Sequence, residues 1–147
     1  MSSRIFLPFG DADSWPTLFE EAGKPVKWLI KDLFVEGNCY SLYAPPGLGK
    51  SALALWLMAR LVTDPEKEDV LVIYLNHETT GVQSAIYLKG MGYDESADFS
   101  RFKHYTLPNM APLNNAKGAK QLDQLIDASV TNYKLDYEEK HGVEHTT

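Results

Sequence analysis

The chain has 147 residues, of which 44% are hydrophobic, and a net charge of −6 at neutral pH. This length supports one globular domain with a hydrophobic core but not two. The acidic balance argues against a freestanding basic surface that clamps nucleic acid by neutralising its phosphates, so any DNA contact would need a local basic patch or an assembled ring.

Targeting signals and cysteine content indicate where such a chain would reside. The N-terminus has no basic segment followed by an apolar one, and no apolar run approaches the roughly 20 residues that span a bilayer. The single cysteine, Cys39, rules out an internal disulfide framework, which suits a reducing cytosol. We therefore expect a cytoplasmic protein with no membrane partner.

Residues 1–36 form an N-terminal lead-in with an apolar patch between Val26 and Val35. Trp28, within this patch, is most simply a core residue, and a contact to a nucleotide base or another subunit is the alternative. A turn at Glu36 and Gly37 leads to a predicted short strand over residues 38–43. Cys39 lies in this strand, where we expect it to be a small buried apolar residue.

Residues 44–51 read Ala-Pro-Pro-Gly-Leu-Gly-Lys-Ser and match the phosphate-binding P-loop at every position but the first, where the usual glycine is Ala44. Glycines in such a loop let main-chain N–H groups converge on the β-phosphate at the positive end of the following helix. The lysine adds a cation for the β- and γ-phosphates, and the serine hydroxyl is placed to ligate Mg²⁺. The predicted nucleotide-binding residues are Pro46, Gly47, Leu48, Gly49, Lys50 and Ser51, and Ser51 is also the predicted metal ligand.

The elements around this motif favour a true P-loop. Residues 51–62 form a nearly all-apolar helix with Arg60 as its only charge, which fits a helix that lies against a parallel sheet. Residues 70–75 are a continuous apolar run rich in β-branched residues, typical of a strand buried on both faces. The order strand, helix, strand predicts a right-handed βαβ unit. The alternative is a Gly/Pro turn that merely precedes a helix.

The rest of the chain continues the same alternation. Thr79 or Thr80 can cap a helix that runs to about Lys89 and ends at the Gly-Met-Gly of residues 90–92. Residues 101–106 alternate apolar with polar and predict another strand, and residues 117–130 predict an amphipathic helix. We expect three parts, namely the lead-in of residues 1–36, an α/β nucleotide-binding core over 37–132, and a polar C-terminal tail over 133–147.

A second set of candidate residues, Asn-His-Glu-Thr at 76–79, follows the strand over 70–75. In an open parallel sheet the carboxyl ends of the strands form the rim where ligands bind. Glu78 is the candidate catalytic carboxylate together with Lys50, because a carboxylate beside the γ-phosphate can orient an attacking water. The alternatives are a solvated loop glutamate for Glu78 and a merely exposed residue for His77, which could otherwise sense phosphate or contact nucleic acid.

The segments WLIKDLFVEGNCYSLYAPPGLGKSALALWLMARL and VLVIYLNHETT resemble the start of the RecA-like ATPase core of plasmid and phage RepA-type replicative helicases, relatives of DnaB-type helicases and RecA. The resemblance covers roughly residues 26–92 and continues more weakly to about 130. It implies a parallel RecA-like sheet, ATP and Mg²⁺ as cofactors, and ATP hydrolysis coupled to DNA unwinding or translocation. It further implies single-stranded DNA as a partner, a hexameric ring, and the family's P-loop lysine and serine and strand-ending glutamate at Lys50, Ser51 and Glu78.

One departure from this family concerns the second acidic (Walker B) motif, an apolar strand that ends in aspartate and supports the Mg²⁺ ligand shell. The nearest match, residues 124–127 ending in Asp127, follows a helical period. The core is therefore expected to stop short of that strand. Two alternatives follow, a non-catalytic nucleotide-binding interaction module and a small-molecule or nucleotide kinase, the latter disfavoured by only 14 Lys and Arg residues.

A metal site at the end of the chain is a further possibility. His141 and His145 are four residues apart, so one helix could bring them together. Gly142 and the polar surroundings favour a solvated tail instead.

Overall fold

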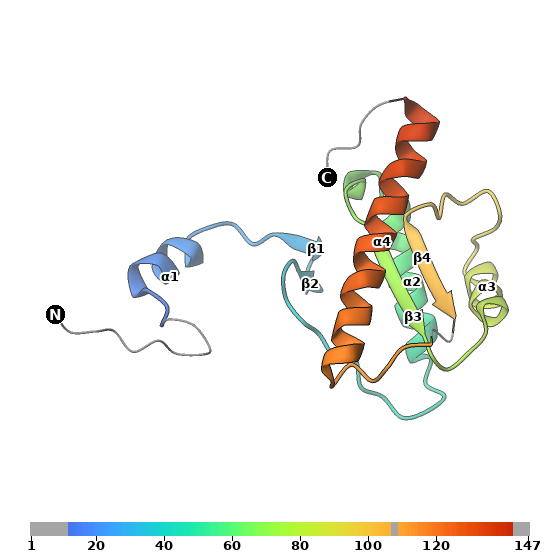
Figure 1. Ribbon diagram of the computed structural model, residues 1–147, viewed down its shortest axis with the longest axis horizontal. Helices are drawn as coiled ribbons and strands as arrows, with labels where there is room; N and C mark the ends of the chain where they lie inside the picture. The colour runs from blue at the N-terminus through green and yellow to red at the C-terminus, as the bar shows by residue number, and fades with distance from the viewer. Residues whose placement is uncertain (1–11, 107–108, 143–147) are drawn as a thin grey trace. The chain divides into compact units, whose positions relative to one another are not determined.

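The computed structural model describes residues 12–106 and 109–142 and divides into two compact units, residues 1–41 and 42–147. The first unit contains helix α1 (Trp15–Ala22) and strands β1 (Trp28–Ile30) and β2 (Phe34–Val35), which pair antiparallel (Figure 1). The turn between these strands places Asp32 at φ 61°, and Leu33 N–H donates to the carbonyl oxygen of Ile30 over 3.0 Å. The apolar patch of the lead-in therefore forms a small hairpin.

The predicted strand over residues 38–43 does not form. These residues have no regular secondary structure, and Tyr40 is held against the hairpin of the first unit. Its hydroxyl accepts a hydrogen bond from Val35 N–H over 2.7 Å, and its ring meets Phe34 edge-on at 4.8 Å between centroids. Cys39 is exposed, so the expectation of a buried cysteine was wrong as well. A side chain committed to the hairpin competes with the strand pairing that the β-forming residues favour.

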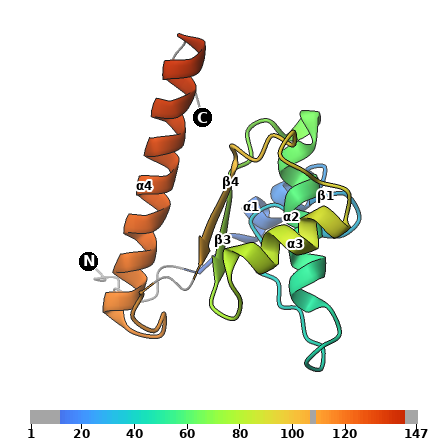
Figure 2. The ribbon, with the colours of Figure 1, turned by 90° about the vertical axis from the view of Figure 1, so that its right-hand side faces the viewer.

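The second unit is an α/β layer structure built on two parallel strands. It contains α2 (Lys50–Thr63), the short 3-10 helix η1 (Pro65–Lys67), β3 (Val72–Asn76), α3 (Gly81–Gly90), β4 (Phe102–Thr106) and α4 (Ala116–His141). Strands β3 and β4 pair in parallel from Val72 opposite Phe102 to Asn76 opposite Thr106. Figure 2 shows α2 and α3 on one face of this sheet and α4 on the other. The predicted α/β fold with a parallel sheet is confirmed.

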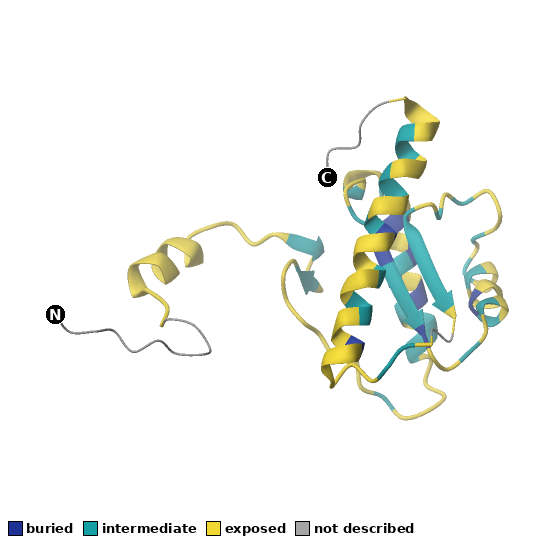
Figure 3. Ribbon diagram, in the orientation of Figure 1, coloured by how far each residue is buried: buried dark blue, intermediate teal, exposed yellow. Residues whose placement is uncertain are grey.

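The hydrophobic core centres on α2, as its apolar sequence predicts. Figure 3 shows buried segments where α2 meets the sheet, and smaller ones on α3 and α4. Leu55 is 1% exposed, and Ala59 is fully buried. The buried apolar residues of the described part of the chain are Leu55, Leu57, Ala59, Leu61, Val62 and Val72. Five of these six residues belong to α2, so this helix is the element around which the unit packs.

Arg101 fixes the direction of α2 relative to the sheet. Its guanidinium donates to the carbonyl oxygens of Val62 over 2.5 Å and Val70 over 3.1 Å, and also to that of Lys67. These bonds hold the C-terminus of α2 beside the start of β4. The N-terminus of α2, which carries the P-loop, therefore lies toward the carboxyl ends of the strands (Figure 1).

Helix α4 extends beyond its predicted end. It continues through residues 133–141, which were expected to belong to a polar tail over 133–147, and its C-cap is Gly142 at φ 62°. The last five residues of that expected tail lie outside the described residues. The rings of Tyr137 and His141 stack at 4.2 Å, and Tyr105 and Ser129 share a hydrogen bond of 2.8 Å that joins α4 to β4. Within the described residues, no helix is both long and apolar enough to cross a membrane.

Candidate functional site

The P-loop turns on two glycines with left-handed backbone conformations. Gly47 and Gly49 both have φ 81°, a region that side chains other than glycine rarely adopt. Leu48 N–H donates weakly to the carbonyl oxygen of Pro45 over 3.5 Å between them. Ala44, which replaces the first glycine of the motif, is not among the described residues with positive φ. Alanine is therefore tolerated at this position because it stays in the ordinary region, as the following proline predicts.

The first turn of α2 is arranged as an anion-binding helix end. Gly49 is the N-cap and supplies no side-chain acceptor, and the first turn contains no acidic residue. Leu53 N–H begins the helical hydrogen bonds by donating to the carbonyl oxygen of Gly49 over 2.8 Å. The N–H groups before it have no intrahelical acceptor, and the helix dipole adds positive potential at the same place. This is the environment that phosphate groups prefer.

Lys50 lies folded over its own loop. Its ammonium group donates to the carbonyl oxygens of Ala44 over 2.8 Å and Pro45 over 3.2 Å. Both acceptors are neutral, whereas a phosphate oxygen is charged and makes a stronger hydrogen bond with an ammonium group. A phosphate in the loop can therefore replace these contacts at low cost. Ser51 is the next residue of the first turn and is half-buried.

Glu78 lies in the loop that follows β3, at the carboxyl end of the sheet. Its side chain is exposed, as is that of His77. Burial, and secondly the charge of Glu78, raise the pKa of Tyr74 above its ordinary value. The charge of Glu78 is therefore felt by Tyr74, the middle residue of β3.

Sequence reasoning missed the structural role of Asn76, the last residue of β3. Asn76 is only 4% exposed, and its amide oxygen accepts hydrogen bonds from the N–H groups of Glu78 and Thr79, both over 3.1 Å. An asparagine at a strand end that precedes a tight turn is a recognisable signal for such main-chain bonds. A further partner of this amide, Ser84, belongs to the next helix, α3, so the turn signal alone could not supply it.

Residues 124–127, the nearest sequence match to the second acidic motif, do not form a strand. Asp127 lies within α4, so residues 124–127 are helical, as their spacing predicts. Among the described residues no group of three His, Cys, Asp or Glu side chains is placed to hold a metal ion. His141 contacts the carbonyl oxygen of Tyr137 over 3.0 Å, whereas His145 lies outside the described residues.

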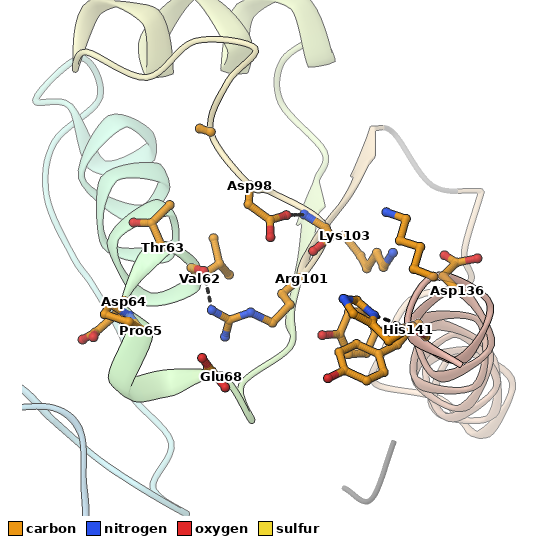
Figure 4. Close-up of a pocket in the computed structure, with 15 residues that line it drawn as sticks. Val62, Thr63, Asp64, Pro65, Glu68, Asp98, Arg101, Lys103, Asp136 and His141 are labelled. Carbon is orange, nitrogen blue, oxygen red and sulfur yellow. Dashed lines mark hydrogen bonds between the residues drawn. The ribbon is translucent and has the colours of Figure 1, made fainter. Parts of the chain in front are cut away.

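A separate pocket of about 990 Å³ lies at the opposite end of the second unit, beside the C-terminus of α2 (Figure 4). Its wall mixes cations with carboxylates, and it includes Tyr133 and Tyr137 of α4. One of the carboxylates, Asp98, has its pKa lowered chiefly by hydrogen bonds from Ser100. The charged side chains that line it are Asp64, Glu68, Asp98, Arg101, Lys103, Asp136 and Lys140. This pocket is distinct from the P-loop.

Comparison with known proteins adds one finding. The family model described as an AAA domain matches residues 8–138, a range that includes the P-loop, β3 and most of α4. The comparison with curated proteins gives no match. The comparison with solved structures gives none either. Since the family model covers most of the 147 residues, the chain belongs to the AAA domain family of P-loop ATPases.

Proposed function

We propose that this chain binds MgATP at the P-loop and is the ATP-binding core of a DNA helicase or a related replication or recombination ATPase. The observation that carries the first part is the N-terminus of α2, where two glycines at φ 81° precede a helix end without a capping side chain or an acidic residue. Family membership supports an ATPase in general. The helicase assignment is supported by the resemblance of residues 26–92 to RepA-type helicases.

Phosphate binding is proposed to use the main chain of the loop together with Lys50. The N–H groups of residues 47–51 would donate to phosphate oxygens. The ammonium group of Lys50 would leave the carbonyl oxygens of Ala44 and Pro45 and donate to the β- and γ-phosphates instead. The first turn fits Mg²⁺ as well, because Ser51 offers a hydroxyl oxygen there and the other ligands of Mg²⁺ are usually phosphate oxygens and waters. Bound Mg²⁺ would neutralise charge on the transferred phosphate.

Hydrolysis is proposed to depend on Glu78. An exposed carboxylate at the carboxyl end of β3 can accept a hydrogen bond from a water and hold it in line with the γ-phosphate. Phosphoryl transfer to water asks mainly for this orientation and for charge stabilisation. The arginine that supplies further positive charge in such enzymes is proposed to come from a neighbouring subunit of a ring.

Single-stranded DNA and a hexameric ring are the partners implied by the helicase resemblance. The net charge of −6 is consistent with DNA binding only through a local surface or an assembly that concentrates cations. A ring would also bring the arginine of one subunit to the ATP of the next.

Turnover of MgATP with and without single-stranded DNA tests this proposal, with wild type compared against Glu78→Gln. We expect DNA to accelerate hydrolysis by the wild type, and Glu78→Gln to bind ATP with ordinary affinity but to turn it over at least about a hundred-fold more slowly. Glu95→Gln is the matched control, since Glu95 is an exposed loop glutamate away from β3. A rate of ATP hydrolysis that single-stranded DNA does not change would contradict the helicase assignment.

A nucleotide-binding module that does not hydrolyse ATP is the second candidate. The observation that favours it is the helical position of Asp127, which keeps this residue from serving as a strand-end Mg²⁺ ligand. Under this alternative, MgATP binds in a manner that depends on Lys50, and neither DNA nor substitution of Glu78 changes the absence of turnover.

A further inference from the structure

Asn76 uses its whole hydrogen-bonding capacity inside the protein. Its amide oxygen accepts from the N–H groups of Glu78 and Thr79, and its amide nitrogen donates to the hydroxyls of Thr79 over 2.8 Å and Ser84 over 3.3 Å. An asparagine side chain has two donor hydrogens and an oxygen with two lone pairs, so these four bonds saturate it. Because Asn76 is only 4% exposed, water does not replace a bond that is lost.

These bonds fold the loop that carries Glu78. The chain leaves β3 at Asn76 and turns back over its amide, so that two successive main-chain N–H groups, those of Glu78 and Thr79, point at the same oxygen atom. The Glu78 side chain itself remains exposed. Asn76 thus fixes the main chain from which the Glu78 side chain extends. Its hydrogen bonds are made to main-chain N–H groups and not to the Glu78 carboxylate.

A hydrogen-bond network through Ser84 and His104 holds the amide group of Asn76. Ser84 of α3 is 3% exposed and shares a hydrogen bond of 2.9 Å with Nε2 of His104 on β4. Nδ1 of the same ring lies 3.4 Å from the Thr106 hydroxyl. The Ser84 hydroxyl thus contacts both the Asn76 amide and the His104 ring, and which atom of the Ser84–His104 pair donates depends on the imidazole tautomer. The network connects the ends of both strands with the start of α3.

We propose that Asn76 is a positioning residue for ATP hydrolysis, which acts by holding the main chain of Glu78 at the carboxyl rim of the sheet. Ser84 and His104 hold the Asn76 amide in the orientation that this requires. The inference rests on the proposed function, because it gives Glu78 the role of orienting the attacking water. A displacement of about 1 Å in such a group can lower turnover about a hundred-fold.

A double-mutant cycle between Asn76 and Glu78 tests the proposal in the full chain. We expect Asn76→Ala to lower kcat by about ten- to a hundred-fold while the Kd for MgATP stays within about three-fold. In the Glu78→Gln background the same substitution should change kcat by less than about two-fold, since it acts only through Glu78. If the two losses multiply, Asn76 does not act through Glu78, and the proposal is overturned.

Amide hydrogen exchange gives a second readout that needs no turnover. The N–H groups of Glu78 and Thr79 should lose protection in Asn76→Ala, whereas those of the paired residues within β3 should keep it. Ser84→Ala should produce a weaker version of the same change, because it removes one of the two partners of the Asn76 amide nitrogen. Unchanged exchange at Glu78 and Thr79 would contradict the proposal even if the variant were slow.

Asn115→Ala is the matched control for loss of stability alone. Asn115 also accepts a main-chain hydrogen bond, from Gly118 N–H over 2.9 Å, but it caps α4. This variant should unfold more readily without a comparable change in kcat. If wild type shows Lys50-dependent binding but no turnover, the proposed hydrolysis and the positioning role both fail. If wild type turns over ATP and Asn76→Ala does so equally well, only the positioning role fails.

Discussion

Lys50 and Ala44 close the P-loop on itself, because the ammonium group of Lys50 donates a hydrogen bond of 2.8 Å to the carbonyl oxygen of Ala44. The first and seventh residues of the motif are thereby brought together, with Gly47 and Gly49 turning the chain between them. The turn of the loop thus comes from its own glycines, and its own residues hold the Lys50 ammonium group near the N-terminus of α2.

Gly49→Ala should weaken both folding and nucleotide binding. Gly49 has φ 81° and nothing within 4 Å of an added Cβ, so backbone strain rather than a clash decides the outcome. We expect unfolding in urea to become easier by about 1–2 kcal/mol, and the affinity for MgATP to fall. Gly90→Ala is the control, since this helix residue also has open space but no positive φ. It should be neutral or slightly stabilising, and equal losses in both variants would contradict the strain argument.

Arg101→Ala should destabilise the second unit strongly. The guanidinium bonds to the carbonyl oxygens of Val62, Lys67 and Val70, which are left without this charged donor when it is removed. We expect a loss of about 2–4 kcal/mol in the free energy of unfolding, measured with urea. Arg101→Lys should recover little of it, because an ammonium group cannot reproduce the planar fork of donors.

Arg60→Ala is the control for Arg101. Arg60 is exposed on α2, and its described contact is with the Trp56 ring, 5.2 Å from the centroid. Loss of the Arg60 side chain should lower the free energy of unfolding by about 1 kcal/mol or less. A similar cost for both arginines would show that the bonds of Arg101 to the main chain do not hold the end of α2 in place.

Asp98 should add a small pH dependence to stability at acidic pH. Hydrogen bonds from Ser100 lower the pKa of Asp98 in the folded chain, so its contribution is present above the ordinary carboxyl pKa of about 3.9 and is lost as the pH falls below it. The unfolding free energy of wild type, relative to Asp98→Asn, should therefore decline from about pH 5 to pH 3. A difference in unfolding free energy between wild type and Asp98→Asn that does not vary over this range would contradict the role given to Asp98. Asn132→Ala, a substitution of an exposed residue of α4, is the control, and its difference from wild type should not change with pH.

Local signals in the sequence predicted much of the second unit. The apolar run that forms β3, the cap at Thr80 and the alternation that forms β4 each lie within one element, so they could be read without tertiary information. The P-loop conformation followed in the same way from its glycines. The roles of Lys50, Ser51 and Glu78 in binding and catalysis stay predictions.

Tertiary contacts explain what the sequence could not predict. The strand expected over residues 38–43 is lost because Tyr40 contacts Phe34 and Val35 of the hairpin, a preference that β-propensity does not express. Helix α4 runs on to His141 because Tyr137 contacts the rings of Tyr133 and His141, each four residues away, and no Gly or Pro lies between Gly118 and Gly142. The role of Asn76 depends on Ser84, a partner on another element.

The central claim, that the N-terminus of α2 is a nucleotide site, is tested most directly by titrating MgATP into wild type and Lys50→Ala and measuring Kd by calorimetry. Lys120→Ala, an exposed lysine on α4, is the matched control. We predict saturable binding to wild type and to Lys120→Ala, and a Kd at least about ten-fold weaker for Lys50→Ala because a charge-assisted contact to phosphate is lost. Equal affinity in all three proteins, or no binding to any of them, would contradict the claim.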